Sequence, residues 1–126
     1  MEIVCLDSSV LIDYYRKKEK SKTFLFNLSG HHSFAISTVV KYEILRGDKK
    51  DTPFWNSLFS TMKSLPFDDQ CAFIASELYK TLKNKNQLIG MDDILIGATA
   101  LRHNLKLATF NRKDFERIEG LTFIAL

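Results

Sequence analysis

The chain has 126 residues, of which 45% are hydrophobic and 26% are charged, and its formal net charge is +3. This composition is typical of a folded globular protein, and the scarcity of Gly and Pro argues against a disordered or linker segment. The length predicts a single domain, residues 1–126, with one substantial core.

The sequence shows no sign of a membrane or secreted protein. No apolar run approaches the roughly 20 residues that a membrane-spanning helix needs, and the start Met1-Glu2-Ile3-Val4 lacks the basic and apolar regions of a secretory signal. Cys5 and Cys71 lie within apolar segments without a metal-binding spacing, so we expect them to be buried, reduced thiols. These features predict a cytoplasmic protein with no membrane partner.

Short apolar runs alternate with helical patterns along the chain. The expected strands are 2–6, 33–37, 64–67, 106–109 and 121–124. The expected helices are a first one capped by Ser8 or Ser9, then 24–30, 38–47, 54–63, 69–86, 92–103 (capped by Asp92) and 112–118. Such alternation predicts an α/β fold with a parallel sheet covered on both faces.

Two of these helices have distinctive apolar patterns. Helix 92–103 is apolar nearly all round and should therefore be buried. The stripe Trp55, Leu58, Phe59 and Met62 is expected to lie mostly in the core. Part of this stripe is also a candidate contact surface for a homodimer.

Carboxylates stand at the ends of several apolar runs. The residues concerned are Asp7, Glu43, Asp92, Asp93 and Asp114, with Asn111 as an uncharged oxygen donor. Parallel strands bring their carboxyl ends to one edge of the sheet, where open α/β sheets bind their ligands. Converging carboxylates are costly unless a hard divalent cation lies between them. The pattern therefore predicts an oxygen-lined metal site at this edge.

The donor types restrict the chemistry of such a site. Without a His or Cys cluster, oxygen ligands favour Mg²⁺ or Mn²⁺ over zinc, and such an ion suits phosphodiester hydrolysis. Ser9 and Thr109 could hold a water or a phosphate oxygen, or could be structural. Basic residues within 16–22, 46–50 and 80–85 suit a polyanion, although lysine-rich helix ends can also be merely solvated.

Each acid also has an ordinary structural interpretation. Asp7 precedes a predicted helix and could simply cap it, aided by the helix dipole. Glu43 could be an exposed surface residue of its helix. Only the joint occurrence of the acids at successive strand ends favours a metal site.

Three segments resemble the PIN-domain family, most closely the VapC-type toxin ribonucleases of type II toxin–antitoxin systems. They are "IVCLDSSVLIDYYR", "AISTVVKYEILRG" and "DDILIGATALRHNLKLATFNRKDFERIEGL". The resemblance implies an α/β/α sandwich, Mg²⁺- or Mn²⁺-dependent cleavage of RNA, and a homodimer. It also implies a small antitoxin protein that blocks the site, and structured substrates such as transfer or ribosomal RNA.

The resemblance assigns roles to individual residues. It makes Asp7, Glu43 and Asp93 the three metal-site acids, and Asp93 is preferred to Asp92 because the family's acid directly precedes an apolar run. The family often has a fourth acid where this chain has Asn111. This departure removes one charge and weakens the case for a second metal.

Further positions match the surroundings of the family's site. Asp114 is a candidate replacement for the missing acid, although it resembles part of the following helix. Ser9 and Thr109 match hydroxyl positions that line the family's pocket, and Arg46 is expected to contact phosphate.

Two other functions fit parts of the pattern. A catalytically weak PIN-fold module that binds RNA or protein would explain Asn111. An aspartyl-phosphate phosphatase would use an Asp at the end of the first strand, but that class needs a second acid two residues later, where this chain has Ser9.

Overall fold

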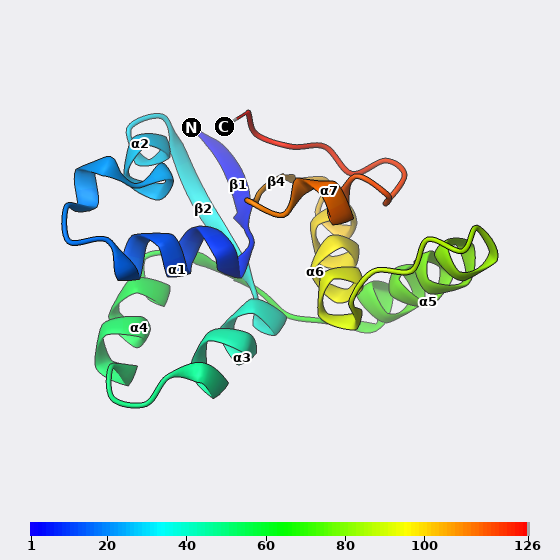
Figure 1. The fold of residues 1–126 in the computed structure, drawn as a ribbon, viewed down its shortest axis with the longest axis horizontal. Coiled ribbons are helices and arrows are strands. Elements are labelled where there is room, and N and C mark those ends of the chain that lie inside the picture. The colour runs from blue at the N-terminus through cyan, green and yellow to red at the C-terminus, as the bar shows by residue number, and fades with distance from the viewer. Residues whose placement is uncertain (126) are drawn as a thin grey trace.

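A computed structural model describes residues 1–125, in which four parallel strands form one sheet (Figure 1). The strands are β1 (Glu2–Leu6), β2 (His32–Ser37), β3 (Lys63–Leu65) and β4 (Lys106–Ala108), in the spatial order β3-β2-β1-β4. In the centre, Val4 of β1 lies opposite Phe34 of β2 and Lys106 of β4. The predicted parallel sheet is therefore confirmed.

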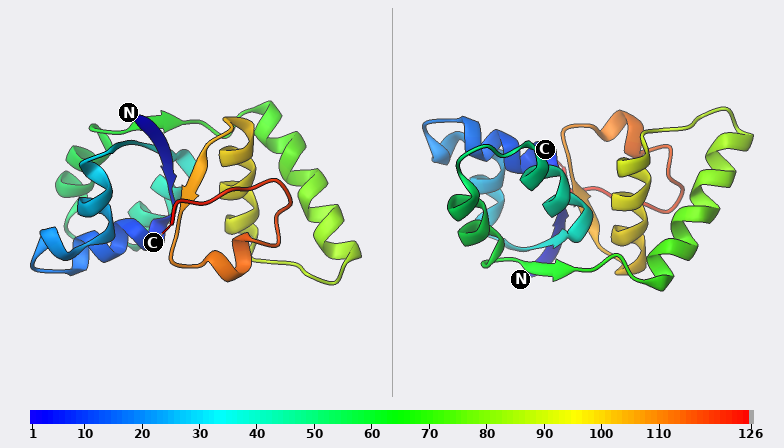
Figure 2. Two further views of the ribbon diagram at one scale, coloured as in Figure 1. Left: turned by 90° about the horizontal axis from the view of Figure 1, so that it is seen from above. Right: turned by 90° about the horizontal axis from the view of Figure 1, so that it is seen from below.

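Helices cover both faces of this sheet. They are α1 (Ser8–Arg16), a 3₁₀ turn (Lys20–Lys22), α2 (Phe24–Ser29), α3 (Thr38–Gly47), α4 (Thr52–Phe59), α5 (Asp69–Asn84), α6 (Met91–Arg102) and α7 (Arg112–Phe115). Figures 1 and 2 show α1, α2 and α4 on one side of the strands and α5 and α6 on the other. This arrangement is the expected α/β/α sandwich. Within residues 1–125, no helix has the length and apolar character needed to cross a bilayer.

The core lies on both faces of the central strand. Val4, Cys5 and Leu6 have no exposed surface, because helices cover both sides of β1. Helix α6 is largely buried, as its all-round apolar pattern predicts. Cys5 and Cys71 are buried free thiols, which excludes a disulfide between them, and burial raises the pKa of Cys5 to about 12.

Hydrogen-bonding side chains cap the starts of α3 and α5. The Ser37 hydroxyl accepts a hydrogen bond from Val40 N at 3.1 Å, and Asp68 Oδ1 accepts one from Cys71 N at 2.9 Å. Both caps lie where the sequence predicts a helix to begin.

Two other predicted caps are wrong. Asp7 rather than Ser8 or Ser9 occupies the cap position of α1, and Gly90 rather than Asp92 occupies that of α6. Asp92 lies within the first turn of α6, where its carboxylate reaches Arg46 instead of the helix's own N–H groups.

Helix α4 differs from its predicted span of 54–63. It begins two residues earlier, with Pro53 in the first turn, and ends at Phe59. The helix stops because Thr61 N and Met62 N bond to the carbonyls three residues back, and Lys63 already pairs with Ala35 in the sheet. Of the aromatic stripe, Trp55 and Phe59 are buried in the core, as predicted.

The strand predicted at 121–124 is reduced to one bridge, between Leu107 and Phe123. Leu107 N donates to Thr122 O at 2.9 Å and Ile124 N donates to Leu107 O at 3.0 Å. Because β4 has only three residues, its outer edge offers little for a fifth strand to pair with. The predicted helix 112–118 likewise contracts to α7.

Phe115 anchors α7 and thereby the segment that carries Asn111 and Asp114. Its side chain is fully buried, whereas Phe73 on α5 is 68% exposed. We expect Phe115→Ala to lower the free energy of unfolding by about 3–5 kcal/mol, and Phe73→Ala to change it by less than about 0.5 kcal/mol. Urea denaturation of both variants tests this, and equal losses would contradict the assigned packing.

Candidate metal centre

The predicted site residues come from four elements that meet at the carboxyl edge of the sheet. Asp7 follows β1, Thr109 follows β4, Glu43 lies on α3 and Asp93 lies in the first turn of α6. Figure 1 places the end of β1 near α1, α3 and α6. The parallel order of the strands thus gathers residues that are far apart in the chain.

Asp7 is the most firmly held of these acids. It is 4% exposed, and its Oδ2 accepts hydrogen bonds from Ser9 Oγ at 2.8 Å and from Thr109 Oγ1 at 2.7 Å. These hydroxyls in turn accept bonds from Phe110 N and Asn111 N. The hydroxyl hydrogens of Ser9 and Thr109 are therefore directed at Asp7. Both side chains position this acid, and their donors are not free for a ligand.

The alternative role of Asp7 as a capping side chain is wrong. The residue occupies the cap position of α1, but its carboxylate makes no cap hydrogen bond. Both hydrogen bonds to Oδ2 come from side-chain hydroxyls instead, and within residues 1–125 none is made to Oδ1.

Glu43 carries an unsatisfied carboxylate. Its Oε1 is buried and has no hydrogen-bond partner among residues 1–125. Burial raises the pKa of Glu43 to about 7, assisted by the neighbouring carboxyl of Asp92 and, less strongly, by Asp7, while the Ser8 hydroxyl acts in the opposite direction. Near neutral pH this side chain is therefore only partly ionised, and a bound cation would stabilise its ionised form.

Asp93 is linked to Asp114 through an amide. Asn111 Nδ2 donates to Asp93 Oδ2 at 3.3 Å and to Asp114 Oδ2 at 3.2 Å. Burial, followed by the charges of Asp7, Asp114 and Asp92, raises the pKa of Asp93 to about 6. Asn111 therefore bridges two carboxylates that would otherwise repel each other, and within residues 1–125 no hydrogen bond is made to its amide oxygen.

Asp92 and Arg46 form a separate contact between α6 and α3. Arg46 Nη2 lies 3.3 Å from Asp92 Oδ2, and the guanidinium carbon lies 5.1 Å from the centre of the Tyr42 ring. A phosphate would therefore have to compete with Asp92 for Arg46. Whether Arg46 contacts phosphate stays a prediction.

The acids approach one another without forming a closed ligand set. Within residues 1–125, no three His, Cys, Asp or Glu side chains are spaced so as to hold an ion. Mutual repulsion of like charges favours this open spacing. The residues nevertheless fit a hard divalent cation, because the donors are all oxygens, Glu43 Oε1 is unpartnered, and two carboxylates have raised pKa values.

Sequence reasoning missed one neighbour of this site, Ser8, whose hydroxyl acts on Glu43 across the interface of α1 and α3. Its only signal in the sequence is its position directly after Asp7.

These features define a parallel α/β/α domain with an acidic, oxygen-donor site at its carboxyl edge. The family model of the PIN domain matches residues 4–121. Ribonuclease VapC1 of Methanocaldococcus jannaschii is 32% identical, over 92% of this chain and 81% of the relative. Ribonuclease VapC1 of Rickettsia felis is 31% identical, over 96% and 94%. The chain therefore belongs to the PIN-domain family, among the VapC ribonucleases.

Solved structures agree with this assignment. A chain of DNA-bound VapBC from Salmonella typhimurium superimposes with a TM-score of 0.84 at 25% identity, over 98% of both chains. VapBC2 from Rickettsia felis, bound to a DNA fragment of its promoter, gives 0.80 at 27% identity, over 97% of both. The resemblance found in the sequence is confirmed.

Thr109 should contribute to stability through its bond to Asp7. Thr109→Val removes a buried donor to a carboxylate, so we expect a loss of about 1.5–3 kcal/mol in the free energy of unfolding. Thr61→Val, at an exposed hydroxyl, is the matched control and should change little. Urea denaturation measures both variants, and a stable Thr109→Val protein would show that the bond contributes nothing.

The raised pKa of Glu43 predicts a pH dependence of stability without metal. The ordinary value is 4.5 and the value in the fold is about 7, so the folded state binds more protons than the unfolded state between these limits. The free energy of unfolding should therefore fall as pH rises from 4.5 to 7. Glu43→Gln should make the fall shallower, whereas Glu77→Gln, at an exposed position, should not. Thermal unfolding across this range in chelator provides the measurement.

Proposed function

We propose that this chain is a divalent-metal-dependent endoribonuclease that acts as the toxin of a toxin–antitoxin pair. The observation that carries the proposal is the set of carboxylates with raised pKa values, Glu43 and Asp93, around the anchored Asp7 in a chain of the VapC group. Ribonuclease activity is what the curated relatives are named for.

In this proposal Asp7, Glu43 and Asp93 hold Mg²⁺ or Mn²⁺, and the Asn111 amide oxygen completes the oxygen set. PIN-domain ribonucleases of this group generally depend on a divalent metal. When bound, such an ion lowers the pKa of a water and stabilises negative charge on the reacting phosphate. Ser9 and Thr109 would act as positioning residues for Asp7, since their hydrogens already point at it.

Glu43, Asn111 and Asp114 would set the charge and geometry of the site before a cation binds. Glu43 would hold a proton near neutral pH in the empty site and release it when a cation arrives, because its burial disfavours the bare carboxylate. Asn111 would keep Asp93 and Asp114 at fixed positions before the cation binds. Asp114 replaces the missing fourth acid only as an outer charge, held through Asn111.

The partners follow from the same assignment. The substrate would be structured RNA, such as transfer or ribosomal RNA, bound by exposed basic side chains. A small antitoxin protein would bind this chain, a partner that is supported by the chain's similarity to a chain of the toxin–antitoxin complex from Klebsiella pneumoniae. Residues 1–126 would act as one cytoplasmic domain.

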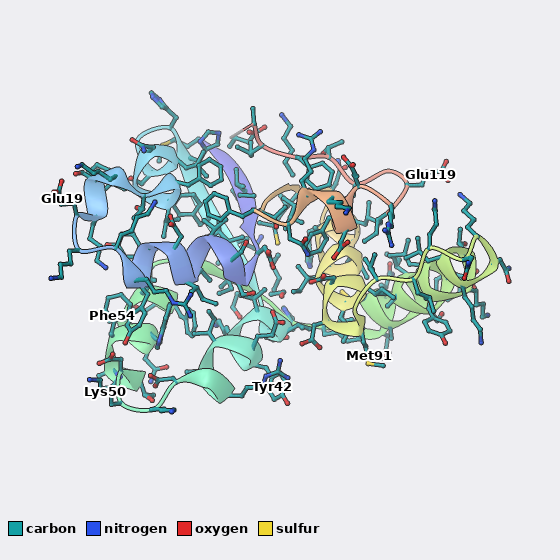
Figure 3. The ribbon with its side chains drawn as sticks, in the orientation of Figure 1. Glu19, Tyr42, Lys50, Phe54, Met91 and Glu119 are labelled. Carbon is teal, nitrogen blue, oxygen red and sulfur yellow. The ribbon has the colours of Figure 1, made fainter. Side chains whose placement is uncertain are left out.

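A homodimer is supported by large exposed apolar side chains, including Tyr42 and Met91 (Figure 3).

One alternative keeps a specific observation in its favour. A catalytically weak module that binds RNA or protein would account for Asn111, which stands where the family often has an acid. The phosphatase alternative gains no such support, since Ser9 donates a hydrogen bond to Asp7 instead of supplying a second acid.

Asp7→Asn should abolish cleavage while preserving the fold. The Asn side-chain oxygen can still accept hydrogen bonds from Ser9 and Thr109. The loss of one negative charge weakens binding of the divalent cation, so we expect the rate of RNA cleavage to fall by roughly a hundredfold or more. Asp69→Asn, at an exposed acid on α5, is the control. The measurement is end-mapping of total RNA incubated with each protein, with Mg²⁺, with Mn²⁺ and with chelator. Full activity of Asp7→Asn, or in chelator, would refute the proposal.

A further inference from the structure

The side chain of Asn111 lies between two carboxylates that belong to different helices. Its Nδ2 is 3.3 Å from Asp93 Oδ2 on α6 and 3.2 Å from Asp114 Oδ2 on α7. Within residues 1–125, neither acid forms a salt bridge, and the neighbouring Arg112 is paired with Glu116 at 3.8 Å. In this part of the chain, the Asn111 amide alone joins the two acids.

The charge of the two acids determines which way this amide faces. An ionised carboxylate only accepts hydrogen bonds, so an amide oxygen turned toward Asp93 and Asp114 would face two acceptors at close range. The amide nitrogen carries two hydrogens, one for each carboxylate, and both bonds are charge-assisted. The partial positive charge of these N–H groups therefore lies between the two negative charges.

The backbone of Asn111 holds its side chain in this place. Its N–H donates to Thr109 Oγ1 at 2.9 Å, and its carbonyl accepts hydrogen bonds from Asp114 N at 3.2 Å and from Phe115 N at 3.4 Å. Phe115 is fully buried and anchors this turn in the core. The amide could therefore leave the two carboxylates only by rotation of its own side chain.

A second divalent ion between Asp93 and Asp114 would have to displace the amide nitrogen. The nitrogen lies between the same two oxygens that such an ion would bind. Mg²⁺ binds oxygen at about 2.0–2.1 Å, so the ion and the nitrogen would occupy nearly the same space. The displacement would also break two charge-assisted hydrogen bonds.

The other side of the acidic site keeps free oxygens. Within residues 1–125, no hydrogen bond is made to Asp7 Oδ1, to Asp93 Oδ1 or to the buried Glu43 Oε1. The Oδ2 atoms of the two aspartates, in contrast, already accept hydrogen bonds. One free oxygen from each of three acids suits one hard cation, which fills its remaining positions with water.

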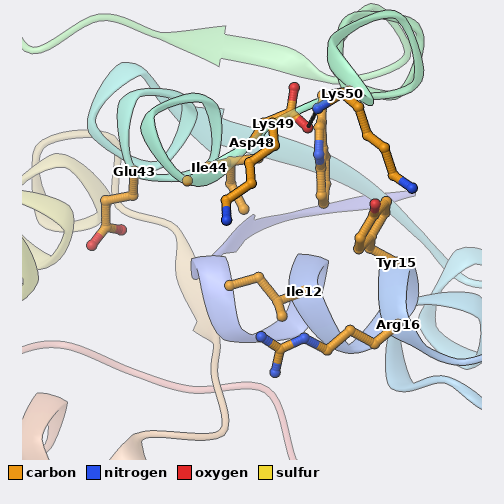
Figure 4. A pocket seen from close by; sticks show the side chains of 10 residues that line it. Ile12, Tyr15, Arg16, Glu43, Ile44, Asp48, Lys49 and Lys50 are labelled. Atoms are coloured by element: carbon orange, nitrogen blue, oxygen red, sulfur yellow. Dashed lines mark hydrogen bonds between the residues drawn. The ribbon is translucent and has the colours of Figure 1, made fainter.

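The charge of Glu43 is not balanced by a basic side chain within residues 1–125, where it forms no salt bridge. Glu43 lines one end of a groove of about 380 Å³ between α1 and the turn that follows α3. Figure 4 shows its carboxylate directed away from Arg16 and Lys50, which line the same groove. Positive charge at this acid is therefore left to a bound ion.

We propose that the Asn111 amide takes the place of a second cation, so that this chain binds a single divalent ion, between Asp7, Glu43 and Asp93. The inference rests on the proposed metal-dependent function and adds the number of ions to it. Two carboxylates that face each other need a positive group between them, and the amide supplies it permanently. An acid at position 111 would instead add a third carboxylate and make a second ion necessary.

Counting bound Mn²⁺ tests this inference. In a titration followed by electron paramagnetic resonance, the signal of free Mn²⁺ reports how many ions each chain retains. The wild-type chain should retain one ion up to millimolar Mn²⁺. Asn111→Asp should retain two, because it exchanges the amide for a further ligand. Asn56→Asp, at an exposed position on α4, is the matched control and should retain one.

Two further variants locate the second ion. Asn111→Asp combined with Asp114→Asn should return to one ion, because the second ion needs both carboxylates. Asn111→Ala removes the bridge without adding a ligand, so it should admit a second ion roughly tenfold or more weakly than Asn111→Asp, the scale of one lost charged ligand. This variant carries the test if Asn111→Asp does not fold.

Thermal unfolding gives a readout that does not depend on counting. Without metal, Asn111→Asp should melt about 4 °C or more below wild type, because three carboxylates then repel one another. Saturating Mn²⁺ should raise the melting temperature of Asn111→Asp by more than that of wild type, since two bound ions stabilise the fold more than one. Asn56→Asp should follow wild type in both conditions.

The outcomes separate this inference from the ribonuclease proposal. Two ions on the wild-type chain, or one ion on a folded Asn111→Asp protein, would overturn the inference and leave metal-dependent cleavage standing. No retained ion on the wild-type chain at millimolar Mn²⁺ would instead refute the metal-dependent function itself. One ion on wild type and two on Asn111→Asp would support the inference even if total RNA stays uncut, a result that contradicts only the ribonuclease proposal.

Discussion

The hydrogen bond between Thr109 and Asp7 joins residues 102 positions apart and links the ends of β1 and β4 at the carboxyl edge of the sheet. It exists because β1 and β4 are parallel neighbours, so the residues that follow each strand emerge side by side. The same loop carries Asn111, whose backbone N–H bonds back to Thr109 and whose amide bridges Asp93 and Asp114. Thr109 and Asn111 thus reach Asp7, Asp93 and Asp114 through one strand pairing, whereas Glu43 lies on α3, which follows β2.

The edge so formed is electrostatically unfavourable without a cation. Glu43 and Asp93 have raised pKa values because they are partly buried among other carboxylates, and Glu43 Oε1 has no partner within residues 1–125. A folded chain tolerates such groups where function requires them, at some cost in stability. The reduced ionisation of Glu43 and Asp93 follows first from their burial and then from the charges of the neighbouring carboxylates.

The surroundings of the acidic edge divide into a structural and an exposed part. Ser9, Thr109 and Asn111 donate side-chain hydrogen bonds to the acids themselves. Arg46 is engaged by Asp92, while Lys49 and Lys50 extend from a turn that Asp48 stabilises. Within residues 1–125, Lys49 and Lys50 form no ion pair and are free to meet a polyanion, whereas Arg46 beside the acids is already paired.

The sequence by itself determined the family and most of the helices and strands. Buried runs such as Val4 to Leu6, the caps Ser37 and Asp68, and the apolar helix after Asp93 carry local information, because hydrogen bonding and burial act over a few residues. The outer limits of α4 and the loss of the last strand did not follow, since they depend on where Lys63 and Leu107 find partners in the sheet. Only the tertiary structure decided that Ser9 and Thr109 hold Asp7, that Arg46 pairs with Asp92, and that a groove opens beside Glu43. Those contacts join residues distant in the chain, and the strand order that brings them together is fixed by packing rather than by any local pattern.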